Sequence, residues 1–284
     1  MAHRRVGDRP RGGGGPAVSA PGTAEPLLAG RVALVIGGSR GIGAGVARAL
    51  GRHGAAVGVN YLHSADAAKE VVAAIEAAGS RAVAVAGDAT DAGDVAQIVR
   101  QTADALGDVD VLVCNAVGST ENAIDRIRKG LTLALDNAED VRARVDTQLA
   151  TTLFPAREVL PGMRRRGGGS IVLIGATASR GRPGRGIAEI SVAKAAQDAL
   201  ARSLAVELGP ERVRVNVVAP GMVPTDANAG PHQEPLMGEM AKVTPLGRVA
   251  YVDDVADTVV AFASGLTRHV TGAYVGVDGG RGML

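Results

Sequence analysis

The chain has 284 residues, of which 46% are apolar and 21% are charged, so it is long enough to bury an ordinary globular core. Its formal charge of +2 lies in residues 1–30, and the remaining 27 basic and 27 acidic residues balance, which excludes a nucleic-acid-binding body because that needs a concentrated basic face. One cysteine, Cys114, excludes a disulfide framework and a metal site of several thiolates. No run of 18 apolar residues predicts a membrane span. We therefore expect a cytoplasmic protein with no metal and no nucleic-acid or membrane partner.

Residues 1–29 have the composition of a disordered N-terminal tail. Glycines run together from Gly12 to Gly15, prolines recur, and apolar periodicity is absent. Such a segment buries too little apolar surface to offset the entropy of ordering it. We expect the folded body to be one domain over residues 30–284.

From Arg31 onward, short β-branched runs alternate with longer amphipathic patterns. Strands are expected at Val32–Ile36, Ala56–Tyr61, Ala82–Ala86, Asp110–Cys114, Ser170–Ile174, Arg212–Val218 and Gly272–Val277. Helices are expected at Ile42–Arg52, Ala65–Ala78, Ala92–Leu106, Glu139–Arg165, Ala188–Leu208 and Tyr251–Ser264. This alternation predicts an α/β fold, a single doubly wound Rossmann domain whose seven-stranded parallel sheet has helices on both faces. The stretch Gly230–Thr244 is interpreted as a mobile insertion over the carboxyl edge of the sheet.

A glycine-rich loop connects the first expected strand to the first helix. It reads Gly37-Gly38-Ser39-Arg40-Gly41-Ile42-Gly43. Glycines at this junction permit a tight turn and bring backbone N–H groups and the helix N-terminus against a pyrophosphate. The strand before the loop and the helix after it favour a dinucleotide site over a plain turn.

The end of the second strand bears on the choice of nicotinamide cofactor. It reads Asn60-Tyr61-Leu62-His63-Ser64, and no acid that would bind a ribose 2′-hydroxyl occurs before Asp66. Arg40 in the glycine loop is placed to pair with a 2′-phosphate, although it can also be an exposed arginine at a helix start. NADP(H) is therefore preferred over NAD(H).

Further motifs lie in or after the third to seventh expected strands. They are Asp88-Ala89, Asn115-Ala116, Lys194 on a long helix, Asn216, Pro220-Gly221, Thr225 and the ending Val277-Asp278-Gly279-Gly280. With the Gly37–Gly43 loop, they make the chain from Arg31 to Gly280 resemble a short-chain dehydrogenase/reductase, similar to the ketoacyl-reductase branch. The resemblance implies a small-molecule substrate and a homotetramer or homodimer formed through the helices Glu139–Arg165 and Ala188–Leu208.

The loop, the second strand and the resemblance together give the expected cofactor site. In the family, the residue at Asp88 contacts the adenine, and the Pro-Gly segment with the residue at Thr225 contacts the nicotinamide end. The expected cofactor residues are Gly37, Ser39, Arg40, Gly41, Ile42, Gly43, Asn60, Tyr61, Ser64, Asp88, Ala89, Asn115, Ala116, Lys194, Pro220, Gly221, Val223 and Thr225.

The catalytic positions depart from the family pattern. In the family, a tyrosine donates the proton, a lysine four residues later lowers that tyrosine's pKa, a serine binds the substrate oxygen, and an asparagine holds a relay water. The lysine matches Lys194, but the tyrosine position is Ile190, which has no proton to give. The serine position is Ala176, and the asparagine aligns with Gln148. Carbonyl reduction by the family's usual proton path is therefore not expected.

Other residues are candidates for the missing roles. Thr177 follows the serine position, although alternation along a strand can turn it away from the cleft. Ser191 and Glu189 flank the tyrosine position, and His232 lies in the expected insertion. Val117, where the family has a glycine, would crowd the cofactor site. The expected catalytic set is Lys194, Thr177, Gln148 and Ser191.

Three functions remain open at this point. The first is an NADP(H)-dependent oxidoreductase that delivers hydride by an altered proton path, with a polyketide-like or other small secondary-metabolite substrate suggested by the Ala-, Gly- and Arg-rich composition. The second is a non-redox cyclase, dehydratase or isomerase that uses the same, more apolar cleft. The third is an inactive partner subunit or cofactor sensor. The fold alone does not choose among them.

Overall fold

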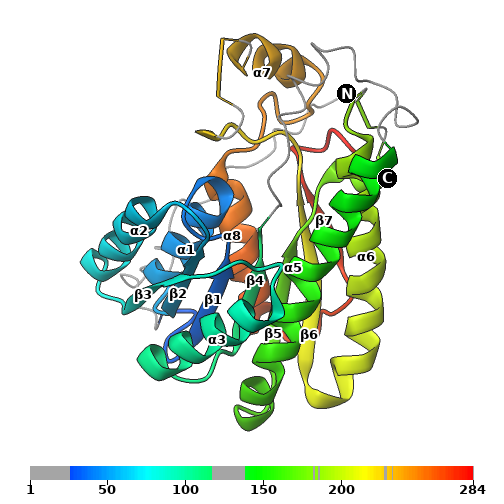
Figure 1. Cartoon of the computed structure of the whole chain (residues 1–284). Coiled ribbons are helices and arrows are strands. Elements are labelled where there is room, and N and C mark those ends of the chain that lie inside the picture. Colours follow the sequence, from blue (N-terminus) through cyan, green and yellow to red (C-terminus); the bar gives the residue numbers. More distant parts are fainter. Residues whose placement is uncertain are drawn as a thin grey trace, which may run out of the picture.

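One parallel sheet organises the chain, and the computed structural model describes residues 26–116, 138–181, 183–184, 186–226, 229–231 and 233–283 of it. The seven strands lie in the order β3-β2-β1-β4-β5-β6-β7 (Figure 1). They are β1 (Val32–Ile36), β2 (Ala56–Tyr61), β3 (Ala82–Ala86), β4 (Val111–Cys114), β5 (Gly169–Ile174), β6 (Val213–Pro220) and β7 (Tyr274–Val277). The order steps outward from β1 in both directions, which confirms the predicted doubly wound architecture.

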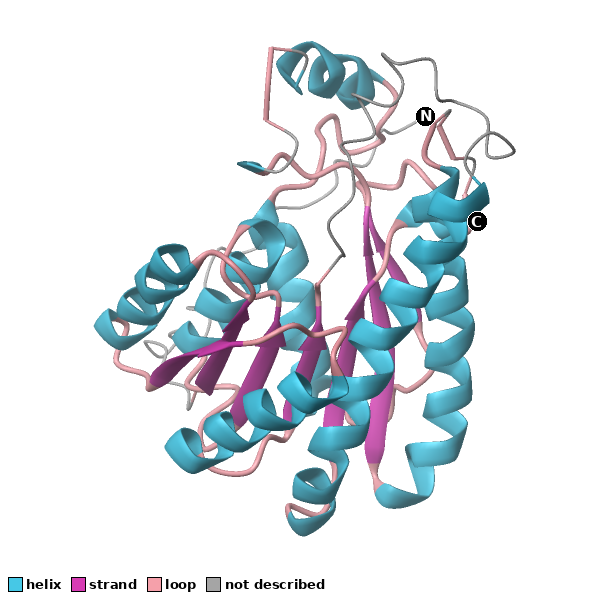
Figure 2. Cartoon of the chain, viewed as in Figure 1, coloured by secondary structure: helices cyan, strands magenta, loops and turns pink. Residues whose placement is uncertain are grey.

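Helices cover both faces of this sheet (Figure 2). They are α1 (Gly41–Arg52), α2 (Ala65–Ala77), α3 (Ala92–Leu106), α5 (Ala138–Arg165), α6 (Ala188–Leu208), α7 (Gln233–Lys242) and α8 (Val252–Ala263). Short 3₁₀ helices occur at η2 (Thr177–Ser179), η3 (Gly209–Glu211) and η5 (Gly265–Thr267). None of the described helices is long and apolar enough to cross a membrane.

The central strand β1 contributes side chains to the hydrophobic core on both faces of the sheet. All five of its residues are buried, and because side chains alternate between faces they feed two separate cores. Ala33 and Val35 belong to the core under α1, α2 and α8, whereas Leu34 and Ile36 belong to the core under α3, α5 and α6. Such continuous apolar strands are characteristic of a parallel sheet covered on both faces.

The insertion expected at Gly230–Thr244 contains a helix that the sequence analysis did not predict. Helix α7 has no buried residue, and Figure 1 shows it above the carboxyl ends of the strands. Pro235 is tolerated because it lies in the first helical turn, where its missing N–H would have no intrahelical partner. A proline-containing, unburied helix lacks the apolar stripe that marks a helix in sequence.

Residues just before Gly30, the expected start of the folded body, contact that body. Leu28 is only 1% exposed and belongs to the core under α1, α2 and α8. Its backbone N–H donates to the His53 carbonyl at 2.9 Å, which ties this segment to the end of α1. The Leu28 side chain and its backbone hydrogen bond therefore hold this segment against the core.

We expect Leu28→Ala to lower the free energy of unfolding by about 2–5 kcal/mol, the usual cost of truncating a buried leucine. Leu27→Ala is the matched control, since Leu27 is 44% exposed, and it should change the free energy by less than about 0.5 kcal/mol. Urea unfolding followed by circular dichroism measures both. Equal effects of the two substitutions would contradict the assignment of Leu28 to the core.

Candidate active site

The principal cleft lies where the carboxyl ends of β1, β2, β4, β5 and β6 meet. It has a volume of about 680 Å³. Every expected cofactor residue except Gly43 lines it, although these residues come from segments spread between positions 37 and 225. Parallel strands bring their carboxyl ends to the same edge of a sheet, so the fold itself gathers these loops.

Two asparagines hold the glycine loop in place. The Gly37 N–H donates to Asn60 Oδ1 at 3.1 Å, and Asn115 Nδ2 donates to the Gly37 carbonyl at 2.8 Å. Gly37 has φ +70°, a conformation that favours glycine. Helix α1 then starts at Gly41 with no acidic residue in its first turn, so its N-terminus is electrostatically suited to an anion.

Gly43 has a packing role behind this loop. A Cβ at this position would lie 2.1 Å from the Gly37 carbonyl oxygen and 2.5 Å from Asn115 Nδ2. Any side chain at residue 43 would therefore push α1 away from the loop. The glycine permits the close approach of helix and loop. It packs against the back of the loop and therefore does not line the cleft.

The end of β2 holds one buried structural residue, and half-buried residues beside it line the cleft. Asn60 is 2% exposed, and its Nδ2 donates to the Val85 and Gly87 carbonyls at 3.3 and 3.1 Å. Its amide is therefore engaged in joining β1, β2 and β3. Tyr61 and Ser64 line the cleft from the same strand end, and the exposed Arg40 faces them from the loop.

Lys194 lies buried at the other end of the cleft, with 5% of its surface exposed. Its Nζ donates to the Ile174 carbonyl at 2.6 Å and to Gln197 Oε1 at 3.2 Å. Burial first, and then the nearby charge of Arg144, lower the pKa of Lys194 to about 7. This amine therefore exchanges a proton near neutral pH.

A chain of hydrogen bonds connects Lys194 to helix α5. Gln197 Nε2 donates to Thr152 Oγ1 at 3.1 Å, and Thr152 Oγ1 donates to the Gln148 carbonyl at 2.9 Å. The four residues are each at most 5% exposed. These buried hydrogen bonds connect α5 to α6 and help to set the spacing of the two helices beside the cleft.

Gln148 presents a donor that no group in the described part of the chain accepts. The side chain is 2% exposed and lines the cleft, and its Nε2 has no hydrogen-bond partner among the described residues. Leaving a buried donor unpaired costs about 1–3 kcal/mol. An oxygen atom of a ligand in the cleft would remove that cost.

Arg144 is a cleft residue that the sequence analysis missed. It is 7% exposed and lines the cleft one helical turn before Gln148. Burial lowers the pKa of the Arg144 guanidinium, and the negative charge of Glu189 raises it. Glu189 is buried but does not line the cleft, so the arginine faces the cavity and its counter-charge lies behind. The i, i+4 spacing from Gln148 was the signal available in the sequence.

The positions expected to correspond to the family's tyrosine and serine line the cleft, and two candidate substitutes do not. Ile190 and Ala176 both line the cleft with Lys194. Thr177 does not line it. It starts η2, and its methyl group lies 3.7 Å from where a Cβ on Gly276 would be. Ser191 does not line it either, and its Oγ donates to the Ile187 carbonyl at 3.1 Å.

Two other expected positions, Val117 and His232, lie outside the described residues. A tyrosine does reach the region of Ala176 from another direction. The Tyr274 hydroxyl donates to the Ala176 carbonyl at 3.1 Å, but Tyr274 is not among the residues that line the cleft. Among the described cleft residues, Tyr61 is therefore the single tyrosine, and it lies at the glycine-loop end.

Comparison with known proteins places these features in a family. Residues 36–281 match the family model described as enoyl-(acyl carrier protein) reductase. The chain is 36% identical to L-rhamnose 1-dehydrogenase (NAD(P)(+)) of Sphingomonas, over 89% of this chain and 97% of that protein. It is 35% identical to the 3-oxoacyl-[acyl-carrier-protein] reductase of Synechocystis (90% and 99%) and to versicolorin reductase 1 of Aspergillus parasiticus (89% and 97%).

Solved structures give the same result. A short-chain dehydrogenase/reductase from Serratia marcescens superimposes with a TM-score of 0.76 at 34% identity, covering 90% of this chain and 99% of that one. A blue fluorescent protein from a metagenomic library, solved in complex with NADPH, gives a TM-score of 0.76 at 35% identity with the same coverage. The similarity in sequence and in structure extends over nearly all of the folded body.

The buried lysine predicts a pH dependence of stability. Between pH 7 and 10.5 the unfolded chain holds a proton on Lys194 that the folded protein lacks, so the free energy of unfolding rises with pH. Lys194→Met removes this contribution. The free energy of unfolding of the wild type should rise relative to that of the variant by up to about 1.4 kcal/mol per pH unit in this range. Urea unfolding at several pH values measures it, with Lys69→Met, at an exposed lysine, as the control. Parallel curves for wild type and Lys194→Met would contradict the lowered pKa.

Proposed function

Because the chain belongs to the short-chain dehydrogenase/reductase family, we propose that it is a cytoplasmic NADP(H)-dependent oxidoreductase with a non-standard active site. Its substrate is a small polyketide-like or other secondary metabolite. The observation that carries the proposal is one cleft that combines the glycine loop with a buried Lys194 beside Ile190. Relatives named 3-oxoacyl-[acyl-carrier-protein] reductase and versicolorin reductase 1 support the reaction class.

The residues of the cleft fit a dinucleotide with a 2′-phosphate. The glycine loop and the N-terminus of α1 would hold the pyrophosphate, and Asp88 with Ala89 would contact the adenine. Arg40, Ser39 and Ser64 would surround the 2′-phosphate, with no acidic side chain at the end of β2 to repel it. The remaining contacts at the nicotinamide end would come from Asn115, Ala116, Lys194, Pro220, Gly221, Val223 and Thr225. When bound, the cofactor supplies or accepts the hydride.

The proton path differs from that of a tyrosine-dependent reductase. Ile190 has no proton to give, and Ala176 has no hydroxyl to hold the substrate oxygen. Lys194 takes the role of acid or base, because its pKa of about 7 lets it hold or release a proton at neutral pH.

The substrate oxygen would be held from helix α5. The unpaired Nε2–H of Gln148 donates a hydrogen bond to that oxygen, which satisfies the buried donor. The guanidinium of Arg144 stabilises negative charge that develops there in the transition state. The cleft is therefore suited to substrates whose reduced form carries a stabilised oxygen anion, such as an enolate or a phenolate. Such an anion does not need a proton at the moment of hydride transfer.

A non-redox cyclase, dehydratase or isomerase is the second candidate. Ile190 and Ala176 replace polar groups of the family with apolar wall, and an apolar chamber favours folding or dehydrating a reactive chain in the absence of water. A catalytically inactive partner subunit or cofactor sensor is the third, and it requires only the cofactor half of the cleft.

Self-association through α5 and α6 accompanies the proposal, as a homotetramer or homodimer. Apolar side chains are exposed on both helices: Leu153 on α5 is 40% exposed, and on α6 Val192 is 47% and Val206 is 78% exposed. Exposed apolar residues gathered on adjacent long helices favour an interface.

Cofactor preference is tested at Arg40. We expect Arg40→Gln to weaken NADPH binding by about tenfold or more, the loss of one charge-assisted hydrogen bond, while NADH affinity changes little. Fluorescence titration with both dinucleotides measures this. Arg100→Gln, at an exposed arginine outside the cleft, is the control. A parallel loss for NADPH and NADH would reject the 2′-phosphate role.

The reaction itself is tested by restoring the missing hydroxyls. We expect Ile190→Tyr with Ala176→Ser to raise the rate of 3-oxoacyl thioester reduction by roughly 10²-fold or more, the usual contribution of a general acid. Loss of NADPH absorbance measures the rate. Ile190→Phe with Ala176→Ser is the matched control, since it differs by one hydroxyl group.

The unaltered protein separates the candidate functions. Turnover of aromatic polyketide ketones or quinones with loss of NADPH absorbance supports hydride transfer. The rate of that turnover should depend on a group that titrates near pH 7, and Lys194→Met should abolish this pH dependence. Turnover without that absorbance loss would reject hydride transfer in favour of the non-redox enzyme. Absence of binding by either dinucleotide would reject both the oxidoreductase and the cofactor sensor.

A further inference from the structure

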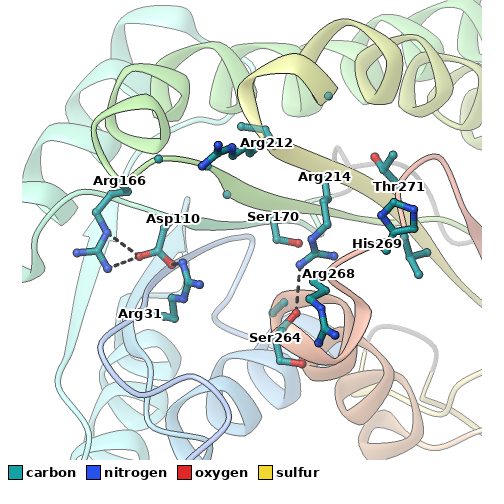
Figure 3. Close-up of a pocket in the computed structure, with 18 residues that line it drawn as sticks. Arg31, Asp110, Arg166, Ser170, Arg212, Arg214, Ser264, Arg268, His269 and Thr271 are labelled. Carbon is teal, nitrogen blue, oxygen red and sulfur yellow. Dashed lines mark hydrogen bonds and ion pairs between the residues drawn. The ribbon is translucent and has the colours of Figure 1, made fainter.

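We propose that the protein binds a phosphate-bearing polyanion in a second cavity, at the amino-terminal edge of the sheet. This cavity has a volume of about 650 Å³ and is independent of the cofactor cleft, with which it shares no residue. It is bounded by the starts of β5 and β6 and by the ends of α5 and α8 (Figure 3). Because the strands are parallel, the two cavities lie at opposite edges of the same sheet.

The lining of this cavity is strongly cationic. One acidic residue, Asp110, faces five arginines and one histidine. The basic residues are Arg31, Arg166, Arg212, Arg214, Arg268 and His269. Five arginines against one aspartate leave four positive charges with the histidine neutral, in a chain whose body has a balanced charge. The cations come from segments far apart in the sequence, so the fold gathers them.

One wall is built on a buried carboxylate. The side chain of Asp110 is completely buried, and it forms ion pairs with Arg166 at 2.7 Å and with Arg31 at 3.6 Å. Arg166 also donates to the Gly30 carbonyl at 2.7 Å. Figure 3 shows both arginines around Asp110 at one end of the cavity. One carboxylate therefore holds two guanidiniums in fixed positions and neutralises only one of them.

The other wall is built on Arg214. Its Nη2 donates to the Phe262 and Ser264 carbonyls at 2.7 and 3.2 Å, and its Nη1 donates to Thr267 Oγ1 at 3.2 Å. The two carbonyls lie at the C-terminal end of α8, whose partial negative charge the arginine offsets. Burial, and then the charge of Arg31, lower the pKa of Arg214, so the two walls repel each other across the cavity.

Helix capping does not account for the remaining cations. In the described part of the chain, the side chains of Arg212, Arg268 and His269 form no hydrogen bond or ion pair. Arg212 has φ +60°, an unfavourable conformation for a residue with a side chain. Gly168 packs against its backbone so closely that a Cβ would lie 2.6 Å from the Arg212 carbonyl oxygen. Arg212 is the C-cap residue of η3, and the chain passes from it into β6, so its side chain belongs to the lining of this cavity.

The charge and shape of the cavity select the ligand. A net formal charge of +4 in the lining calls for an anion with at least two negative charges, and guanidinium forks match the geometry of phosphate oxygens. Helices α5, α6 and α8 end here, so they offer carbonyls and no free N–H groups to an anion. Recognition therefore depends on the arginines alone, in contrast to the glycine loop.

Pyrophosphate is the probe that tests this site. We expect saturable binding of pyrophosphate to the full chain by isothermal titration calorimetry in the presence of saturating NADPH, with affinity falling as NaCl is raised. Arg212→Asn with Arg268→Gln should weaken it at least tenfold, asparagine being chosen because it tolerates a positive φ. Arg100→Gln with Arg142→Gln, two exposed arginines outside both cavities, should leave the affinity unchanged.

Three results would overturn the assignment of binding to this cavity. They are the absence of saturable binding, an unchanged affinity in the Arg212→Asn/Arg268→Gln variant, and a loss of binding confined to Arg40→Gln, which would place pyrophosphate at the glycine loop. Citrate, a carboxylate of comparable charge, should bind more weakly than pyrophosphate. Equal affinity for citrate would overturn the assignment to phosphate. Unchanged NADPH binding in the double variant separates this site from the cofactor cleft.

Discussion

The clamp on the Gly37 backbone is the interaction on which the cofactor half of the protein depends. Asn60 accepts from its N–H and Asn115 donates to its carbonyl, so one residue at the end of β1 is tied to the ends of β2 and β4. These three strands are neighbours in the sheet. Because β2 and β4 flank β1, their asparagines can bond Gly37 from both sides and fix the conformation of the glycine loop. Gly43 lets α1 close on this loop, and the N-terminus of the helix then faces the cleft.

The substrate half depends on a different constraint, the burial of charge between α5 and α6. Arg144, Glu189, Lys194 and Asp198 are each at most 7% exposed. Burying charges is costly unless they are paired and hydrogen-bonded. The protein meets this cost with the bonds from Lys194 to Ile174 and Gln197, and by lowering the pKa of the lysine. The same burial makes Lys194 an acid or base that works near neutral pH, which a solvated lysine is not.

How far the sequence predicted this protein depends on how local each signal was. Strands such as Val32–Ile36 were predicted to the residue, because a short run of apolar side chains indicates both the length of the strand and its burial. The glycine loop was predicted because its conformation demands glycine at fixed spacing. The roles of Asn60 and Arg144 were not predicted. Asn60 was taken for a ligand contact, yet its partners Gly37, Val85 and Gly87 are distant in the chain. Arg144 is buried near Glu189 of another helix, and a contact between two helices cannot be read from either segment alone.

The two edges of the sheet show how one topology produces two unlike electrostatic environments. In a doubly wound fold, helices that follow strands start at the carboxyl edge and end at the amino edge. Backbone N–H groups therefore converge on the cofactor cleft, where glycine and a helix N-terminus suffice to attract a phosphate. Carbonyls converge on the amino edge, where they repel anions and attract cations. Arg214 caps α8 and Arg166 pairs with Asp110 there. Arg212 and Arg268 have no such partner in the described part of the chain, so they add positive charge to an edge where the backbone offers carbonyls.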